Sequence, residues 1–407
     1  MELRFRKDDG TEYPKWKMIP LGDLCSMTNG ISKGKEYFGK GNKFVNLQDL
    51  FGKDELREGD YELVEVTDKE LSDKSLLKGD VLFVRSSVKP SGVGLPCVVM
   101  EDMNDTVFSG FIIRARFFSD LLNLTYKKYC FIENGFRNEL LKRSSVSANT
   151  NISQPNLAIL PVKVPCLEEQ QKIAAFLSSV DEVIAASEEE VKNLEEQKKG
   201  VMQKIFSQEV RFKKDDGSAY PEWEEKRMDS TADLILGGGT PSTQNESYYK
   251  GSIPWISSSD LMEGSSKANK WRFITNDAIN SSATKLIPKG SLLIVSRVGL
   301  GKVAIADEDL CTSQDFTNLV GIKENIHYLY YAVHNRMQKE AKKAQGTAIK
   351  GITSSDIKSF KMMFPCLEEQ QKIASFLSSF DEAIDAAKKE LECWKAIKKG
   401  LLQQMFE

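Results

Sequence analysis

Two long stretches of the chain carry apolar residues at steps of alternately four and three positions. Counting in this way from Ile173 to Ile205 gives eight apolar residues in ten positions, and from Ile373 to Met405 it gives nine in ten. This spacing is typical of a coiled-coil seam and predicts two helices, each of about 40 residues and roughly 60 Å long. The predicted seam residues are Ile173, Leu177, Val180, Ile184 and Leu194 in the first helix and Ile373, Leu377, Phe380, Ile384 and Trp394 in the second.

The two helical stretches are copies of each other. Residues 165–206 and 365–406 align without a gap and are identical at 24 of 42 positions. Pro165 and Pro365 mark the helix starts, and the paired glutamates that follow favour the positive end of a helix dipole. A second block, LRFRKDDGTEYPKW at 3–16, returns as VRFKKDDGSAYPEW at 210–223. The chain therefore alternates between variable segments (1–164 and 210–364) and constant ones (165–209 and 365–407).

Neither apolar seam is stable in water by itself, so each helix needs a partner. The matched length of the two seams favours pairing with each other; the alternative is that each helix lies on a globular domain. Gly200 and Gly400 interrupt both patterns at the same place, where a glycine costs about 0.5–1 kcal/mol. Their repetition indicates either a bend or a close approach of another backbone.

Charge separates the two kinds of segment. Acidic residues outnumber basic ones by 18 to 11 in the constant segments, whereas basic residues outnumber acidic ones by 45 to 41 in the variable segments. A phosphate backbone repels acidic helices, so we expect these helices to face protein and the variable segments to face nucleic acid. The loops at 29–44, 248–260 and 267–273 combine lysine or arginine with serine, asparagine, glycine or aromatic residues, which can bind phosphates and base edges. For any single residue, an ordinary solvated loop is the alternative.

Targeting signals and cysteine pairs are not found in the sequence. No run of 18 apolar residues and no apolar core of a signal peptide is present, so we expect a cytoplasmic protein with no membrane partner. The seven cysteines are odd in number and form no C-x-x-C pair, which favours neither a disulfide framework nor a zinc site. We expect them to be reduced and buried.

Catalytic motifs are incomplete. VGLGKV at 298–303 lacks the first glycine of a phosphate loop and has Val303 where Ser or Thr is needed, and GGGT at 237–240 has Ser242 in place of the last dinucleotide-binding glycine. His327 and His334, on a predicted helix at 325–344, have no ligands at metal spacing. The chain has neither the Pro-Pro dipeptide of amino-methylating DNA methyltransferases nor the Pro-Asp dipeptide of a common nuclease core. The sequence predicts a non-catalytic chain without a metal.

The order of variable domain, PCLEEQQKIA helix, second variable domain and the same helix resembles the DNA specificity subunit of type I restriction-modification enzymes over the whole chain. The segments ISQPNL and ITSSDI also look like the family's short segment before each helix. The family's helix start, PxLxEQxxIxxxL, is matched by Pro165, Leu167, Glu169, Gln170, Ile173 and Leu177.

The resemblance implies an α+β fold with an internal pseudo-twofold repeat. Two globular mixed α/β target-recognition domains, 1–164 and 210–364, would be joined by two long helices, 165–209 and 365–407, that form an antiparallel coiled coil. Each domain would read half of a split site in double-stranded DNA. The helices would dock two modification subunits, adenine methyltransferases that bind S-adenosylmethionine, and restriction subunits using ATP and Mg²⁺ would complete a nuclease and translocase. The chain itself would hold no cofactor.

The resemblance does not identify base-reading residues, because recognition domains differ between family members. Composition favours Lys33, Lys35, Lys43, Arg85, Lys89 and Arg143 in the first domain and Lys250, Lys270, Arg272, Arg297, Lys302 and Lys350 in the second as DNA-binding residues. Arg85 and Arg297 follow two similar strands, LFV at 82–84 and LIV at 293–295, and could project from comparable strand ends.

Two other functions remain open. A coiled-coil adaptor would bind other proteins and show no salt-dependent affinity for DNA. A self-sufficient restriction enzyme would bind S-adenosylmethionine itself, although the missing motifs argue against it.

Overall fold

The computed structural model describes residues 3–262, 266–344 and 351–406. Its contacts divide the chain into two compact units, which we call unit 1 (Met1–Glu188 with Lys389–Glu407) and unit 2 (Glu189–Lys388). This division cuts across the segments predicted from the repeat. Each unit holds one globular domain together with about half of each long helix.

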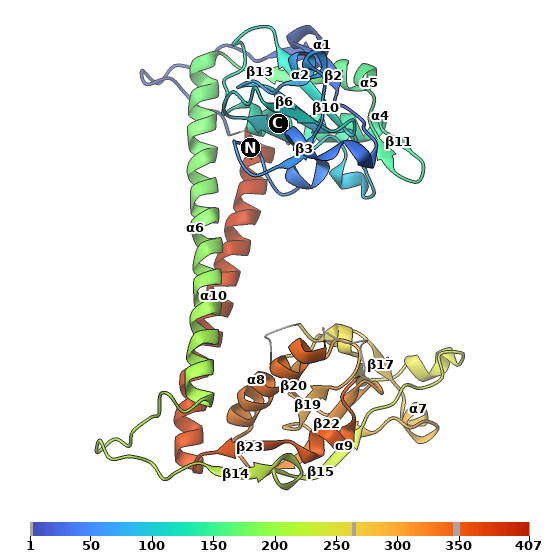
Figure 1. Ribbon diagram of the computed structural model, residues 1–407, viewed down its shortest axis with the longest axis vertical. Helices are drawn as coiled ribbons and strands as arrows, with labels where there is room; N and C mark the ends of the chain where they lie inside the picture. Colours follow the sequence, from blue (N-terminus) through green and yellow to red (C-terminus); the bar gives the residue numbers. More distant parts are fainter. Residues whose placement is uncertain (1–2, 263–265, 345–350, 407) are drawn as a thin grey trace. The chain divides into compact units, whose positions relative to one another are not determined.

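The two predicted helices are α6 (Leu167–Phe206) and α10 (Leu367–Phe406), and each has 40 residues. In unit 1 the first part of α6 lies antiparallel beside the last part of α10, and Lys395 pairs with Glu188 at 2.9 Å (Figure 1). In unit 2 the arrangement repeats with the helices exchanged, and Lys388 pairs with Glu195 at 2.6 Å. The predicted α+β fold with an antiparallel helix pair is therefore confirmed.

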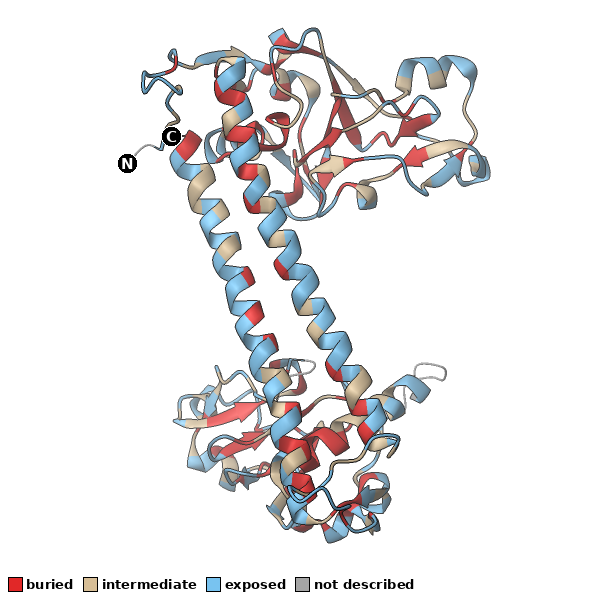
Figure 2. Ribbon diagram, turned by 90° about the vertical axis from the view of Figure 1, so that its left-hand side faces the viewer, coloured by how far each residue is buried: buried red, intermediate tan, exposed pale blue. Residues whose placement is uncertain are grey.

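The predicted seam residues all lie on the covered side of a helix. Buried positions recur along one side of α6 and of α10 (Figure 2). Among the ten, Ile173, Leu177, Val180, Ile373, Leu377 and Ile384 are buried and Ile184, Leu194, Phe380 and Trp394 are half-buried.

The ends of the long helices also pack on the globular domains. Ile173 belongs to the same hydrophobic core as Val162 of unit 1 and Phe406 of α10, and Ile373 belongs to the core of unit 2 with Tyr328. Both interpretations of the seams are therefore correct in part. The middle parts of α6 and α10 pair with each other, and the ends of these helices pack on the globular domains.

The globular domain of unit 1 is built on a mixed five-stranded sheet in the order β2-β10-β6-β8-β4. Its strands are β2 (Cys25–Asn29), β10 (Ile112–Phe117), β6 (Val81–Val84), β8 (Pro96–Val99) and β4 (Glu55–Leu56). Three smaller sheets accompany it: β5 (Glu62–Val64) with β3 (Phe38–Val45) and β9 (Thr106–Phe108), β11 (Ser145–Val146) with β12 (Thr150–Asn151) and β7 (Ser86–Ser87), and β1 (Lys17–Pro20) with β13 (Pro161–Val164). The helices are α1 (Leu21–Leu24), α2 (Asp68–Lys74), α3 (Lys127–Cys130), α4 (Asn134–Arg143) and α5 (Gln154–Ala158).

The globular domain of unit 2 has two four-stranded sheets. The first is antiparallel, in the order β15 (Ala232–Gly237), β22 (Phe316–Ile322), β19 (Leu292–Val295) and β20 (Val303–Ile305). The second is β17 (Phe273–Ile274), β16 (Ile253–Ile256), β21 (Leu310–Thr312) and β18 (Leu286–Ile287), and β14 (Glu224–Arg227) pairs with β23 (Lys361–Phe364). The helices are α7 (Asn276–Asn280), α8 (Ile326–Ala344) and α9 (Ser354–Ser359).

A helix packs behind the sheet in each unit, but only one is continuous. The helix predicted at 325–344 is α8, whereas its counterpart in unit 1 is broken into α3 and α4. Glu133 lies at the break and caps α4, because its carboxylate accepts hydrogen bonds from the backbone N–H groups of Gly135 (2.6 Å) and Phe136 (2.8 Å).

Of the two interpretations of Gly200 and Gly400, the close approach of another backbone is wrong for the described residues. A Cβ added at either glycine would meet none of their atoms within 4 Å, and both helices continue through these positions. The cysteines are not all buried, since Cys393 is exposed and Cys166 and Cys366 are half-buried. Within the described part of the chain, no helix is long and apolar enough to cross a membrane, and no cluster of three or more His, Cys, Asp or Glu residues could hold a metal ion.

Candidate nucleic-acid interface

In unit 1 the chain leaves the middle strand β6 at Arg85 and enters a surface loop. The backbone N–H of Arg85 donates to the carbonyl of Phe111 (2.8 Å), and its carbonyl accepts from Ile152 (3.0 Å). The next residues form β7, which pairs Ser87 with Thr150 of β12. Three segments distant in sequence (85–95, 109–111 and 145–152) therefore meet where the central strand ends.

Unit 2 repeats this junction at Ser296, one residue before Arg297. Ser296 is the structural counterpart of Arg85, because its N–H donates to Asp315 (2.8 Å) and its carbonyl accepts from Ile352 (2.8 Å). Arg297 comes one position later and is exposed, next to Val298, which is 72% exposed. The two arginines therefore leave neighbouring but not equivalent positions of comparable strand ends.

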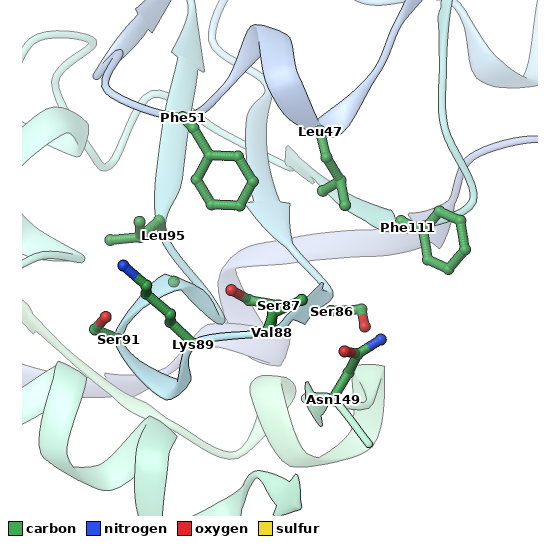
Figure 3. A pocket seen from close by; sticks show the side chains of 11 residues that line it. Leu47, Phe51, Ser86, Ser87, Val88, Lys89, Ser91, Leu95, Phe111 and Asn149 are labelled. Atoms are coloured by element: carbon green, nitrogen blue, oxygen red, sulfur yellow. The ribbon is translucent and has the colours of Figure 1, made fainter. Parts of the chain in front are cut away.

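The junction in unit 1 borders a hollow of about 570 Å³ (Figure 3). One side is apolar, and Phe51, Phe111 and Leu95 lie on it; Ser86, Lys89 and Asn149 lie on the other. The full lining is Leu47, Phe51, Ser86, Ser87, Val88, Lys89, Ser91, Gly92, Leu95, Phe111 and Asn149. Among the described residues that line the hollow there is no carboxylate, so none of them repels a phosphate.

Five of the predicted DNA-binding residues already form ion pairs, and in four of them the pair lies near the surface. These four pairs are Lys33–Glu70 (2.8 Å), Lys43–Glu58 (2.5 Å), Arg143–Glu139 (3.4 Å) and Lys270–Asp307 (2.5 Å). The hydrogen bond from Lys33 lowers the pKa of Glu70, and the bond to Glu58 raises the pKa of Lys43. Pairs near the surface contribute only about 0–1 kcal/mol, so a phosphate can displace the carboxylate at small cost.

Arg272 is held much more firmly. Its guanidinium lies over the rings of Trp255 (4.6 Å) and Trp271 (4.4 Å) and bonds to Ser257 and to the carboxylate of Asp260, which is 3% exposed in its side chain. Burial tends to raise the pKa of Asp260, but hydrogen bonds from Ser257, Trp271 and Arg272 outweigh it and lower that pKa. Arg272 thus has a structural task that a base contact would disturb.

The remaining predicted residues differ in their freedom to bind a ligand. Lys35, Lys89, Lys250 and Arg297 are exposed and form no ion pair with any residue in the described ranges. Other groups are bound to carbonyls: Arg85 donates to Gly110 (3.1 Å), and Lys302 donates to Ser258 (3.2 Å) and Leu261 (2.7 Å). Lys350 lies outside the described residues.

The residues predicted from composition do not include the apolar residues of this surface. Val88 is 81% exposed and Phe111 is 57% exposed, although apolar residues are usually covered in a folded domain. Asn149 was missed because a single asparagine in the polar run SSVSANTN carries no signal by itself. Only the meeting of three distant segments shows that these residues share a site.

Each globular domain is fastened to the long helices by the same set of side chains. In unit 1 the hydroxyl of Tyr129 donates to Asp181 of α6 (2.8 Å), lies 3.0 Å from the hydroxyl of Ser178, and Asp181 also pairs with Lys398 of α10. Burial raises the pKa of Tyr129, so the hydroxyl stays protonated and can donate.

Unit 2 contains the same arrangement. The hydroxyl of Tyr331 donates to Asp381 of α10 (2.5 Å) and lies 3.2 Å from Ser378, while Asp381 pairs with Lys198 of α6. Two of the three exceptions to the apolar seam, Lys198 and Lys398, are thereby explained, because each binds an aspartate on the opposite helix. The third is Ser187, whose hydroxyl donates to the carbonyl of Val183 in its own helix (2.9 Å).

A comparison with protein families identifies the repeat. The model described as "Type I restriction modification DNA specificity domain" matches residues 13–196 and again residues 220–392. The chain belongs to this family. Each match takes in one globular domain and most of the long helix that follows it.

Named relatives agree with this assignment. The MjaIX specificity subunit of the type I restriction enzyme from Methanocaldococcus jannaschii is 35% identical over 208 residues, 49% of this chain and 48% of the relative. The EcoR124I/EcoR124II specificity subunit from Escherichia coli is 36% identical over 154 residues, 36% of this chain and 38% of the relative. The chain thus matches about half of the first relative's length.

Solved structures share the fold over nearly the whole chain. The type I restriction-modification S subunit from M. genitalium has a TM-score of 0.53 at 14% identity, and the match covers 99% of this chain and 97% of that one. A chain from a solved type I R-M system, studied for complex assembly and conformational transition, has a TM-score of 0.62 at 17% identity, covering 96% and 97%. At such identities the likeness concerns the fold alone.

The glutamate and glutamine of the family's helix start bind each long helix to the globular domain before it, in both specificity domains. Gln170 is fully buried; its side chain accepts from the N–H of Asn123 (2.7 Å) and donates to the carbonyl of Pro165 (2.9 Å). Gln370 does the same with Asn325 (2.9 Å) and Pro365 (2.9 Å). The motif therefore joins the start of each long helix to the domain before it.

Proposed function

We propose that this chain is the non-catalytic DNA specificity subunit of a type I restriction-modification enzyme and that each unit reads half of a split site in double-stranded DNA. The observation that carries the proposal is the repetition of one scaffold with two different surfaces. Both specificity domains are joined to the helices by equivalent tyrosine–aspartate–lysine contacts, whereas the loops after β6 and β19 differ in sequence.

Local charge supports DNA as the ligand of these loops. Lys89 in unit 1 and Arg297 in unit 2 are exposed just beyond the central strand, without an ion pair to a described residue. Exposed cations in such a position can bind phosphates, and neighbouring polar and apolar side chains can then contact base edges. Arg297 is the more suitable for guanine, because its planar guanidinium can bond two acceptors at once.

The long helices support two equivalent partners. Outside the seam, Leu167 and Leu367 are 47% and 59% exposed, and Phe176 and Phe376 are 37% and 38% exposed, at equivalent positions of α6 and α10. Equivalent apolar residues exposed twice are suited to two copies of one partner. In this proposal the partners are adenine-methylating modification subunits that bind S-adenosylmethionine, and restriction subunits supply the ATP- and Mg²⁺-dependent nuclease.

A genome-wide map of N6-methyladenine tests the proposal. Cells that carry this chain and its neighbouring methyltransferase are compared with cells that lack only this chain. We expect the loss of one split motif, two short defined halves separated by unspecified bases. Identical maps, with both proteins shown to be expressed, would contradict the proposal.

Binding measurements separate this function from that of a protein adaptor. The complex of this chain with its methyltransferase should lose affinity for the mapped duplex steeply as salt rises, because bound phosphates release counterions. Arg297→Ala should weaken binding by about 1–3 kcal/mol if Arg297 contacts a base. An affinity independent of salt would favour the adaptor, whereas an unchanged affinity of Arg297→Ala alone would only remove that residue from the interface.

A further inference from the structure

The hollow in unit 1 is lined mainly by apolar groups, with a few polar side chains along one edge. Phe111 and Phe51 lie on the apolar wall together with Leu47 and Leu95, and both phenylalanines keep a large exposed fraction, 57% and 44% (Figure 3). Phe111 directly precedes β10, which places it at the rim of the hollow. A single apolar group that enters from outside would be covered on several sides.

The opposite wall includes the turn between β11 and β12, two-residue strands of the three-stranded sheet that also contains β7. β11 and β12 pair Val146 with Thr150, and Thr150 in turn pairs with Ser87 of β7, so the turn is anchored to the loop after the central strand. Asn149 lies in this turn; its carbonyl accepts from the N–H of Ser147 (3.0 Å). Its side chain is exposed, lines the hollow and forms no hydrogen bond with a residue of the described ranges.

These features match one kind of ligand surface. In the major groove of B-DNA, thymine alone among the four bases carries a methyl group and adenine offers N6–H and N7 to a carboxamide. Lys89 at the same rim supplies a charge for a phosphate, and none of the described lining residues is a carboxylate. A G·C pair has no methyl group to fill the phenylalanine wall, and its polar edge atoms would lose hydrogen bonds to water there.

We infer that this hollow reads one A·T base pair from the major groove: the thymine methyl contacts Phe111 and its apolar neighbours, and the Asn149 carboxamide bonds to N6 and N7 of the paired adenine. The inference rests on the proposed function, because it requires that the first specificity domain binds DNA. It assigns a base pair and a groove to residues that the sequence did not single out.

Base analogues test the inference on the assembled protein. The full chain, co-purified with its methyltransferase, is titrated with duplexes of the mapped target in which one thymine at a time is replaced by deoxyuridine, which lacks only the methyl group. One such replacement should lower the affinity of the wild-type complex about 3- to 10-fold, since a buried methyl group is worth roughly 0.8 kcal/mol or more. Replacing the paired adenine with 7-deazaadenine should also lower the affinity.

Variants then locate the two effects. In Phe111→Ala, replacing the thymine with deoxyuridine should no longer change the affinity. The matched control is Phe118→Ala, which removes another phenylalanine of the same domain that is 67% exposed and lies outside the hollow. In that control the loss of affinity on replacement should persist. In Asn149→Ala the 7-deazaadenine effect should vanish and binding of the normal target should fall roughly 5- to 150-fold. If Phe111→Ala folds poorly, Phe111→Leu should reduce the deoxyuridine effect while keeping the wall apolar.

Each outcome decides a different question. A wild-type complex that prefers the mapped target over a scrambled duplex but is indifferent to every deoxyuridine overturns the inference and leaves the proposed function intact. The same holds if the deoxyuridine effect is equal in wild type and Phe111→Ala. A complex with no preference for the mapped target at the same salt overturns the proposed function, and the inference falls with it.

Discussion

The two units hold the start of a long helix with the same buried carboxylate but complete its hydrogen bonds differently. In unit 1 the guanidinium of Arg4 bonds to Glu169 (2.9 and 3.2 Å). In unit 2 Arg211 bonds to Glu369 (3.4 and 3.0 Å), and the indole N–H of Trp223 also donates to that carboxylate (3.1 Å). Both glutamates are fully buried, so each needs its partners.

The equivalent tryptophan of unit 1 has no such bond. Trp16 lies edge-on against Phe406 (5.7 Å), and its buried N–H has no hydrogen-bond partner among the described residues. The repeat therefore preserves the ion pair in both units, whereas the tryptophan bond occurs in unit 2 alone. The difference shows which contact the scaffold requires and which it tolerates losing.

The surfaces beyond the central strand differ far more. At the junction, Phe111 of unit 1 is replaced by Asp315 in unit 2, and Arg85 by Ser296, although the backbone bonds are the same. An aromatic and an acidic residue cannot bind the same ligand group. The scaffold thus keeps the backbone at this site while the side chains vary, which agrees with the proposal that the two domains read different half-sites.

The largest expected effect comes from removing the arginine in each unit. Arg4→Ala leaves Glu169 buried without a cation and should lower the free energy of unfolding of unit 1 by about 3–5 kcal/mol, toward the lower end because Arg4 keeps some contact with solvent. Arg211→Ala should cost about 1–2 kcal/mol less in unit 2, because Trp223 still donates to Glu369. Urea unfolding of the two variants, with the exposed Arg6→Ala as the control, measures the difference. Equal costs would show that the Trp223 bond contributes nothing.

Substitutions of the two tryptophans test the same difference between the units, because they remove the N–H group instead of the arginine. Trp223→Phe removes a hydrogen bond to a carboxylate and should lower the free energy of unfolding by about 1.5–3 kcal/mol more than Trp16→Phe, since both changes remove a similar part of the ring. In Trp16→Phe the substitution also removes a buried N–H that has no partner among the described residues, and this should offset part of the free energy lost with the smaller ring. Thermal unfolding of both variants checks this order, and a larger loss in Trp16→Phe would contradict it.

The tyrosine contacts should behave alike in the two units. Tyr129→Phe and Tyr331→Phe each delete one hydrogen bond to an aspartate that still has its lysine on the opposite helix, so each should lower the free energy of unfolding by about 1–2 kcal/mol. Their near equality is the prediction. A cost confined to one variant would show that the two fastenings are not equivalent despite their matched geometry, and calorimetry on the full chain can detect it.

The helical part of the fold follows from local rules and could be predicted from the sequence. The seam spacing and the prolines located the helices to within three residues of α6 (Leu167–Phe206) and α10 (Leu367–Phe406). The lysines at 198 and 398 could be recognised as exceptions to the seam, but their aspartate partners could not. Those partners depend on the antiparallel register, which the sequence pattern does not contain.

The candidate interface could be predicted only in part. Exposed cations such as Lys89 and Arg297 stand out by composition, although composition alone also selects Arg272, whose charge is already bound by Asp260. The hollow escaped prediction because its walls come from segments separated by tens of residues. Exposure of an apolar side chain such as Phe111 is a tertiary property that no local pattern announces.

The smallest expected effect concerns a feature that the two units share. Gly200 and Gly400 lie within continuous helices, and a Cβ at either position would meet nothing within 4 Å. Gly200→Ala and Gly400→Ala should therefore each stabilise the chain by about 0.5–1 kcal/mol, because alanine loses less backbone entropy than glycine in a helix. Urea unfolding of the single and double variants measures the gain, which should be additive. A destabilised isolated chain would mean that alanine strains the helix. Stabilisation of the isolated chain with weaker binding of the methyltransferase would instead show that the partner approaches the backbone closely at both glycines, and would explain why a residue unfavourable in a helix is present in both copies.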